Sequence, residues 1–191
     1  MKKIKQIVTI FATLALAVTA GLSFAGTKTK AAGSDEFTRT AIEIAADMGY
    51  GWNLGNTMEA TNTWTSNPKV TDFETAWGQP VTTKSMIDGI KKAGFNSIRI
   101  PVSWSNMMSS DGNYTIDASY FKRVDEIISY AFANDMYVII NDHYDGGWWE
   151  HFCGNKRDCM KHYKNMWTQV AGHYKDCLLY TSPSPRDRTR S

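Results

Sequence analysis

Three short apolar runs, each followed by a long polar loop and then an amphipathic helix, limit what this chain can fold into. The runs lie at residues 50–54, 95–101 and 136–141. A further helix is expected over 34–48, before the first run, with Ser34 as its cap. Because strands that alternate with helices form parallel sheets with crossover helices, the pattern predicts an α/β fold.

The loops of these βα units differ strongly in length. The turns from helix to strand are short ("GFN" and "NDM"), whereas the loops from strand to helix are long and hold most of the Trp, Asn, Asp and His residues. A (β/α)8 barrel builds its site from such loops, and a whole barrel takes roughly 250 residues. We therefore expect an incomplete (β/α)8 TIM barrel, about the first three βα units after a leading helix. A dinucleotide-binding sheet is disfavoured because "GWNLGN" does not match Gly-x-Gly-x-x-Gly.

Residues 1–25 have the pattern of a secretory signal peptide. Three lysines precede an apolar stretch at residues 7–18, and "SFA" at residues 23–25 offers small residues to a signal peptidase. The stretch is shorter than the roughly 20 residues that span a bilayer. We expect secretion to the extracellular space, with no membrane attachment after cleavage.

The segment 177–191, "CLLYTSPSPRDRTRS", has no apolar period. It is either a disordered tail or an unrelated sequence, because "LLYTSPSPRD" is similar to translated adapter DNA. The domain would then occupy residues 34–176. The chain carries a formal charge of +2, and since the first 25 residues contribute +3 and the last 15 contribute +2, the remainder carries −3. The basic charge belongs to the ends, so no nucleic-acid partner is expected.

Cysteine and histidine give little guidance. Cys153 and Cys159 flank "GNKRD", and a secreted protein could join them, but spacing alone leaves the disulfide open. His143, Asp145 and His151 crowd the third long loop, but their spacing fits no familiar metal motif. We expect neither a metal nor a cofactor.

The side chains that follow the strands suit a carbohydrate. A sugar presents hydroxyl groups around a ring with an apolar C–H face, so its site needs amides and carboxylates for the hydroxyls and Trp for the face. Such groups follow all three strands: Asn53, Asn56 and Glu59; then Arg99 and Trp104; then His143, Tyr144, Asp145, Trp148 and Trp149.

Five segments in order carry a family resemblance: "GWNLGNTMEA", "ETAWGQPVTT", "GFNSIRIPVSW", "YTIDASYFKRVDEIISYA" and "YVIINDHYDGGWWE". Residues 41–176 resemble the N-terminal part of glycoside hydrolase family 5, especially its bacterial endo-β-1,4-glucanases. The resemblance implies a (β/α)8 barrel, and retaining hydrolysis of cellulose or a related β-linked polysaccharide by a monomer. A mannanase or xyloglucanase of the same family, or a non-catalytic carbohydrate-binding protein, is the alternative.

The catalytic pair that the resemblance implies has no counterpart in this chain. Retaining hydrolysis uses two carboxyl groups about 5–5.5 Å apart. In the family both are Glu, one after strand four in an Asn-Glu-Pro motif and one after strand seven, and no Asn-Glu-Pro occurs here. Glu150 follows the third strand, which the family does not use, and Glu43, Glu74 and Glu126 read as helix or loop surface. We expect the chain as printed to bind sugar without hydrolysing it.

The supporting residues can be carried over. Arg99, in "RIP", matches the family arginine that holds the nucleophile, and His143, in "NDH", matches the histidine that lines the −1 subsite. We expect both to face the same hollow. Tyr144 stands where many relatives have a second histidine.

The remaining candidates are substrate contacts. The polar pair in "NTMEA" matches residues that line the cleft in related cellulases. One of three Trp residues is expected to stack on sugar, and two others are assigned to packing. The cleft residues are Asn56 and Glu59, the stacking candidates are Trp104, Trp148 and Trp149, and the packing residues are Trp52 and Trp167.

Overall fold

Four parallel strands form the sheet, in the order β1-β2-β3-β4. The computed structural model describes residues 40–175 and 180–181, so the proposed signal segment 1–25, residues 34–39 of the predicted first helix and nearly all of the tail lie outside it. The elements are α2 (Ala41–Met48), β1 (Gly51–Asn53), α3 (Val70–Glu74), α4 (Lys84–Lys92), β2 (Ser97–Val102), η2 (Trp104–Met107), α5 (Ala118–Phe132), β3 (Tyr137–Asp142), η3 (Asp145–His151), α6 (Lys156–Tyr174) and β4 (Tyr180–Thr181).

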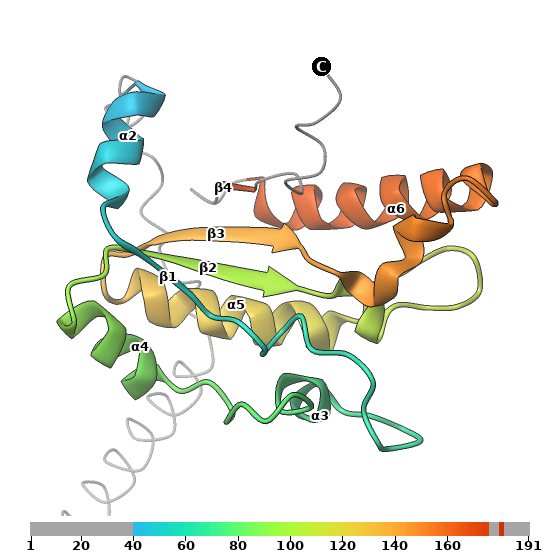
Figure 1. Ribbon diagram of the computed structural model, residues 1–191, viewed down its shortest axis with the longest axis horizontal. Coiled ribbons are helices and arrows are strands. Elements are labelled where there is room, and N and C mark those ends of the chain that lie inside the picture. The colour runs from blue at the N-terminus through green and yellow to red at the C-terminus, as the bar shows by residue number, and fades with distance from the viewer. Residues whose placement is uncertain (1–39, 176–179, 182–191) are drawn as a thin grey trace, which may run out of the picture.

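The strands point the same way, and the long loops lie beyond their carboxyl ends (Figure 1). This confirms the predicted parallel α/β arrangement. The outer edge of β3 is paired over part of its length. Tyr180 and Thr181 pair in parallel with Ile139 and Ile140 of β3.

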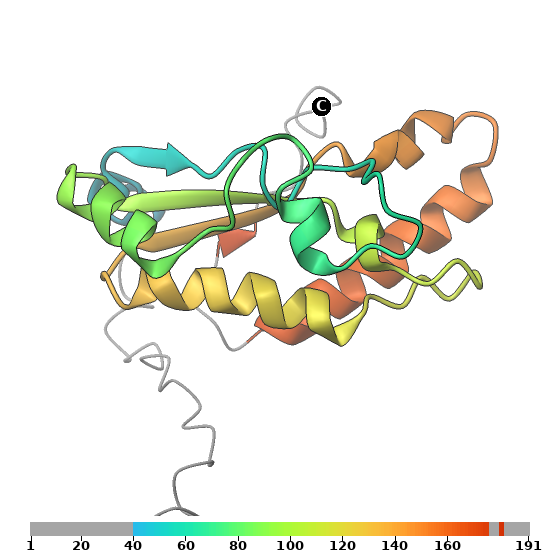
Figure 2. The same ribbon diagram turned by 90° about the horizontal axis from the view of Figure 1, so that it is seen from below.

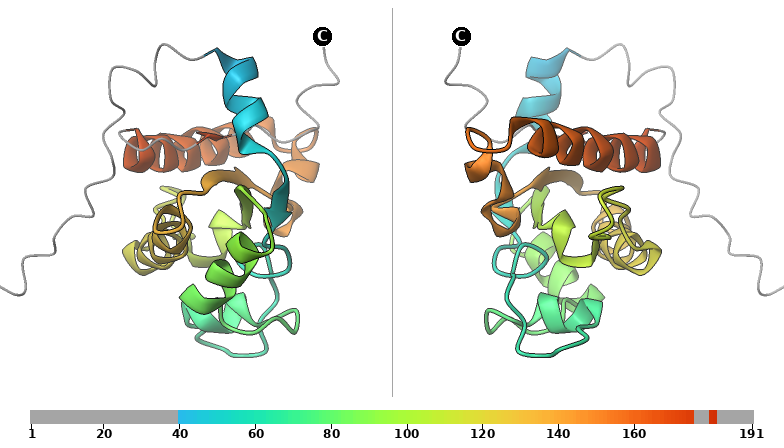
Figure 3. Two further views of the ribbon diagram at one scale, coloured as in Figure 1. Left: turned by 90° about the vertical axis from the view of Figure 1, so that its left-hand side faces the viewer. Right: turned by 90° about the vertical axis from the view of Figure 1, so that its right-hand side faces the viewer.

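Side chains on one face of the sheet form the core. Helix α5 runs along this face (Figure 2), and α4, α5 and α6 are arranged around the sheet in the end-on views of Figure 3. Since successive strand side chains point to opposite faces, the alternate residues of β2 and β3 meet the helices together. The buried cluster includes Ile98, Ile100 and Val102 of β2, Val138 and Ile140 of β3, Val124, Ile127, Ile128 and Ala131 of α5, and Met166 and Val170 of α6. Each buried side chain of this size contributes about 1.5–3 kcal/mol.

Polar side chains begin the helices. Thr40 and Glu43 form a reciprocal capping box at the start of α2. Thr83 caps α4, because its side chain accepts from the backbone N–H of Met86. Asp117 caps α5 in the same way through Ser119.

Three local features complete the description of the elements. Strand β2 continues through Pro101 to Val102, because Pro101 lies beyond the last β1 residue in register and loses no ladder bond there. Asp135, with φ 50°, makes the left-handed turn after α5. On α6, Tyr163 does not join the buried face, since its side chain is 45% exposed.

Within the residues that the structure describes, none of the helices is both long and apolar enough to cross a membrane.

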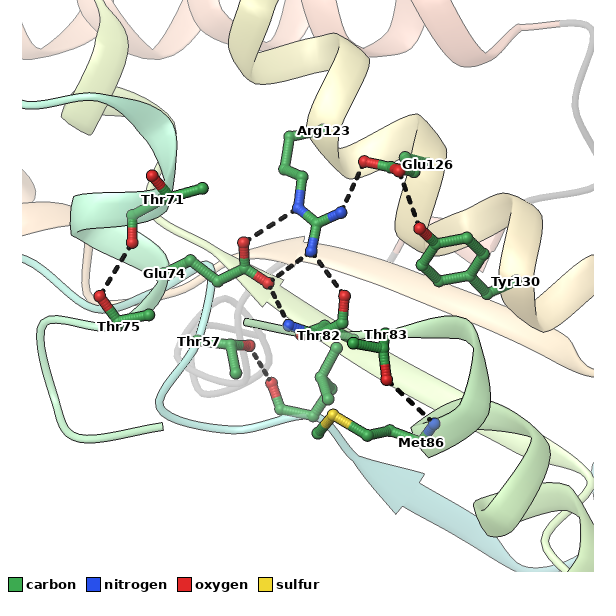
Figure 4. A network of polar contacts seen from close by, with 11 residues as sticks. Thr57, Thr71, Glu74, Thr75, Thr82, Thr83, Met86, Arg123, Glu126 and Tyr130 are labelled. Carbon is green, nitrogen blue, oxygen red and sulfur yellow. Dashed lines mark hydrogen bonds and ion pairs between the residues drawn. The ribbon is translucent and has the colours of Figure 1, made fainter. Parts of the chain in front are cut away.

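A buried ion pair ties the loop after β1 to α5 (Figure 4). Glu74, predicted to lie at the surface, is fully buried, and its carboxylate accepts from Nε (2.9 Å) and Nη2 (2.8 Å) of Arg123. The same carboxylate accepts from the backbone N–H of Thr82 (2.7 Å), whose carbonyl accepts from Arg123. Because Glu74 and Thr82 flank residues 75–81, this pair closes that segment into a loop against α5.

Removing the arginine should therefore destabilise the fold. In Arg123→Met, the buried carboxylate of Glu74 loses its countercharge, and we expect the free energy of unfolding to fall by about 3–5 kcal/mol. Urea unfolding followed by circular dichroism measures the loss. Lys84→Met is the control, because its pair with Asp88 is exposed (54% and 43%) and should contribute only about 0.3–0.5 kcal/mol. Equal losses in the two variants would contradict the prediction that the buried pair contributes more than the exposed one.

Candidate functional site

Three side chains at the carboxyl ends of β1, β2 and β3 form a hydrogen-bonded row. Asn53 and Arg99 are partners in the parallel register, and Arg99 Nη1 donates to Asn53 Oδ1 at 2.6 Å. Arg99 Nη2 lies 3.1 Å from His143 Nδ1. Arg99 and His143 thus lie on the same side of the sheet and in contact, as the sequence analysis expected. The sequence analysis named Asn53 among the polar groups after the first strand but gave it no specific role. Its position at the end of that strand was the feature that indicated one.

The row fixes the protonation of His143. A guanidinium has only donors, so Nδ1 of His143 accepts, and the proton of the neutral ring is on Nε2. Burial lowers the pKa of His143, and the positive charge of Arg99 lowers it further, against the opposing effect of Glu59. Burial also lowers the pKa of Arg99, again opposed by Glu59. The site therefore offers a neutral imidazole with an N–H donor next to a guanidinium.

Glu59 is buried, and its carboxylate closes its own turn. Oε1 accepts from the backbone N–H of Asn56 at 2.6 Å, and Oε2 accepts from that of Thr57 at 3.0 Å. Its acceptors thus face the backbone, and its charge acts on Arg99 and His143. Asn56 is exposed with φ 60°, and its contact with substrate stays a prediction. A Cβ at Gly55 would lie 2.7 Å from Asn53 Nδ2, so a larger residue there would displace the Asn53 side chain.

Four successive residues after β3 have left-handed backbone: Tyr144, Asp145, Gly146 and Gly147, with φ of 58°, 48°, 68° and 72°. Such a run is costly for the two non-glycine residues and persists only where the surroundings hold it. Functional loops are the usual place for this strain.

Asp145 holds that loop. It is 1% exposed, its Oδ1 accepts from the backbone N–H of Ser105 at 2.7 Å, and its Oδ2 accepts from Ser105 Oγ at 2.8 Å and Trp148 Nε1 at 2.6 Å. The backbone of His143 is fixed nearby, since its carbonyl accepts from Ser103 Oγ at 3.1 Å. The buried carboxylate of Asp145 therefore joins the loops after β2 and β3. The sequence analysis placed Asp145 in a polar cluster but did not predict this link.

The predicted stacking residues are placed differently. Trp104 is fully buried and packs on Tyr120 and Phe121, with ring centroids 6.1 and 5.3 Å away, so its predicted sugar contact is wrong. The ring begins η2 directly after a buried strand, where the core covers it. Trp148 is half-buried, since its ring stacks on His162 at 4.1 Å while its N–H is bound to Asp145.

Trp149 is also tied to the loop, because its Nε1 donates to the carbonyl of Tyr144 at 3.2 Å. Its contact with sugar stays a prediction, as does that of Tyr144. Trp167 packs against the core as expected. Trp52, assigned to packing, contacts Phe95 edge-on at 5.3 Å but is 42% exposed.

Sequence reasoning missed Trp77. This side chain is 42% exposed, and its ring centroid lies 6.4 Å from that of Tyr144. The signal was present in "ETAWGQP", but nothing in that loop indicated which strand end it would approach.

Cys153 and Cys159 are both free, the first exposed and the second buried. Among residues 40–175, no three His, Cys, Asp or Glu side chains lie close enough to hold a metal ion together. The oxygens of Asp145 are instead committed to Ser105 and Trp148.

A second buried carboxyl group adjoins Asp145. Burial raises the pKa of Asp142, and the negative charge of Asp145 and a hydrogen bond to it raise it further. Burial also raises the pKa of Asp145, although its bonds to Ser105 and Trp148 oppose the rise. Because Asp145 accepts three hydrogen bonds, Asp142 is the member of the pair that keeps a proton at neutral pH.

This pair predicts a pH dependence of stability. The folded chain keeps a proton on Asp142 that the unfolded chain releases above pH ~4, so the free energy of unfolding should fall as pH rises from ~4 through neutrality, by up to ~1.4 kcal/mol per pH unit. Asp142→Asn keeps the shape without the titration and should remove this component. Urea unfolding across that range compares the variants. Asp135→Asn, at an exposed left-handed position, should keep the parental slope. An unchanged slope in Asp142→Asn would refute the assignment.

Comparison with known proteins identifies the family. The family described as Cellulase (glycosyl hydrolase family 5) matches residues 58–177. Endoglucanase A of Paenibacillus barcinonensis is 41% identical over 178 residues, which cover 88% of this chain and 43% of that protein.

Solved structures agree. The GH5-4 broad specificity endoglucanase from Ruminococcus champanellensis, with bound cellotriose, has a TM-score of 0.70 at 40% identity, covering 76% of this chain and 43% of that one. A GH5 family lichenase from Caldicellulosiruptor sp. F32 has a TM-score of 0.66 at 42% identity, covering 75% and 39%. This chain spans less than half the length of these relatives. The predicted resemblance and the partial (β/α)8 barrel are both confirmed, and the chain belongs to glycosyl hydrolase family 5.

Proposed function

We propose that this chain supplies the Arg99–His143 side of the active site of an endo-β-1,4-glucanase that hydrolyses cellulose or a related β-glucan. The observation that carries the proposal is the row Asn53–Arg99–His143 across three adjacent strand ends. This row places a guanidinium and a neutral imidazole side by side at the carboxyl end of the sheet, where barrel enzymes bind substrate.

The chemistry of the row suits a retaining glycosidase. Such an enzyme attacks the sugar with a carboxylate and protonates the leaving oxygen with a second carboxyl group. Two N–H groups of Arg99 are committed to Asn53 and His143, and the guanidinium carries five, so it can also hold a carboxylate nucleophile. The Nε2–H of His143 can donate to a sugar hydroxyl.

Substrate and reaction type are supported by the relatives. Their names describe an endoglucanase, a broad specificity endoglucanase bound to cellotriose, and a lichenase. A cellulosic or mixed-linkage β-glucan fits all three. For the 191 residues alone we propose sugar binding without hydrolysis, because the sequence contains no Asn-Glu-Pro motif.

A chimera tests the activity. Residues 58–175 of this chain would replace the matching segment of the Paenibacillus barcinonensis endoglucanase. We expect the chimera to release reducing ends from carboxymethyl-cellulose, whereas the 191-residue chain alone releases none. In the chimera, Arg99→Lys should lower kcat by about 100-fold, since lysine cannot reproduce the paired geometry of a guanidinium. Arg157→Lys, at an exposed position on α6, is the control and should leave kcat unchanged.

Two outcomes would count against the proposal. A chimera that folds, by circular dichroism and thermal unfolding, but hydrolyses no β-glucan would remove the assigned function. Turnover by the 191-residue chain alone would show that the catalytic pair is other than proposed.

We also propose that residues 1–25 direct secretion and that the exported protein acts as an extracellular monomer. The basic, apolar and small-residue order of this segment supports the proposal. N-terminal sequencing of the exported chain should find the cut after Ala25 or close to Ala31-Ala32. A chain that keeps Lys2 after export would contradict it.

A further inference from the structure

The backbone turns sharply directly after His143. Tyr144 has φ 58° and ψ −57°, and the backbone N–H of Asp145 donates to the carbonyl of His143 at 2.7 Å. A three-residue turn with this bond and a positive φ at its centre is a γ-turn of the rare, strained kind. Such a turn persists only where its surroundings hold it. Asp145 is held by Ser105, so the His143 end of the turn needs a partner of its own.

Ser103, the first residue after β2, is that partner. It is fully buried, and its Oγ lies 3.1 Å from the carbonyl oxygen of His143 and 2.9 Å from that of Glu59. A hydroxyl carries one proton, so the two carbonyls share a single donor. The partners lie 40 and 44 residues away along the chain, in the loops after β3 and β1. One side chain therefore connects the loops that follow all three of these strands.

The Glu59 end of this connection is firmly anchored. Residues 58–60 are buried, and each of their three successive carbonyls accepts a hydrogen bond from another part of the fold. The donors are Tyr120 Oη (2.7 Å) and the Ser103 backbone N–H (3.0 Å) to Met58, Ser103 Oγ to Glu59, and Asn106 Nδ2 (2.8 Å) to Ala60. The segment therefore keeps its place without the Ser103 hydroxyl, and His143 is the partner whose position depends on it.

The other backbone bond of His143 does not replace this contact. The N–H of His143 donates to the carbonyl of Val102 at 3.0 Å, which continues the parallel register of the sheet. That bond fixes the entry of the chain into the turn, but it leaves rotation about ψ of His143 free. Without the Ser103 hydroxyl the strained turn can relax, and the imidazole can then move away from Arg99.

We propose that Ser103 is a positioning residue for hydrolysis: its hydroxyl fixes the His143 carbonyl to the anchored segment 58–60 and so keeps the imidazole in contact with Arg99. This inference rests on the proposed function, in which the Nε2–H of His143 donates to a sugar hydroxyl. Ser103 is buried and acts on the reaction only through His143. A small displacement of a group that orients the substrate is costly to the rate.

The pKa of His143 in the 191-residue chain tests the positioning without a measurement of activity. The chain has four histidines, and the imidazole NMR signal that disappears in His143→Gln is that of His143. The two largest influences on this pKa, burial and then the charge of Arg99, both lower it. In Ser103→Ala the ring becomes more hydrated and leaves the guanidinium, so we expect the pKa to rise towards its ordinary value.

Ser129→Ala is the matched control, because the Ser129 hydroxyl also donates to a backbone carbonyl, that of Glu126, at 2.6 Å. It lies on α5, away from the row, and its loss should leave the pKa of His143 unchanged. If Ser103→Ala does not fold, Ser103→Cys takes its place, since a thiol is of similar size but is only a weak donor. Circular dichroism shows which variants are folded.

Activity of the chimera is the second readout. Ser103→Ala should lower kcat by about 10- to 100-fold, whereas KM for carboxymethyl-cellulose should change much less, because the other contacts with the polymer remain. Ser129→Ala should change neither. A merely structural serine would lower the thermal stability of the chimera without this separation of kcat from KM.

The two readouts distinguish the possible failures. A folded Ser103→Ala or Ser103→Cys variant with the parental His143 pKa and the parental kcat would overturn the positioning role alone. A parent chimera that folds but hydrolyses no β-glucan would overturn the proposed function. The pKa comparison would then still decide whether Ser103 places His143.

Discussion

The parallel register of β1, β2 and β3 is the constraint on which the site depends. This register places Asn53 of β1 directly opposite Arg99 of β2. It also aligns β3 with β2 so that His143, which follows β3, contacts the same guanidinium. Because side chains alternate along a strand, the residues on either side of Arg99 enter the helix-facing core. Apolar burial on one face thus determines where the polar row lies on the other.

The apolar periodicity of the sequence was sufficient to predict the fold, because the burial of apolar side chains determines which segments become strands and helices. The order of strands and helices, the parallel sheet and the side of the sheet that bears the site all follow from apolar runs and loop lengths. Arg99 and His143 could be paired in advance because Arg99 lies three residues before the carboxyl end of β2 and His143 directly follows β3, where register leaves little freedom. Positions further into the loops had no such constraint.

The errors share one physical origin. Glu74 and Trp104 were judged by residue type, but their burial depends on partners distant in sequence: Arg123 lies 49 residues from Glu74, and Tyr120 lies 16 from Trp104. A carboxylate is rarely buried without a countercharge beside it, and the local sequence pattern does not show which distant residue supplies that charge. Trp77 was overlooked for the same reason, since its neighbour Tyr144 comes from another loop. Long-range pairing, rather than local propensity, is what the sequence does not reveal.

The left-handed run from Tyr144 to Gly147 has a bearing on how this loop can evolve. Side chains at the two glycines would be strained, and a changed loop length would move the carboxylate of Asp145 away from Ser105. Insertions and deletions are therefore disfavoured, whereas exchange of the exposed ring at position 144 leaves the backbone path intact. Sequence change in this loop should therefore concentrate at position 144, where an exposed ring can be exchanged while the buried carboxylate keeps the loop in place.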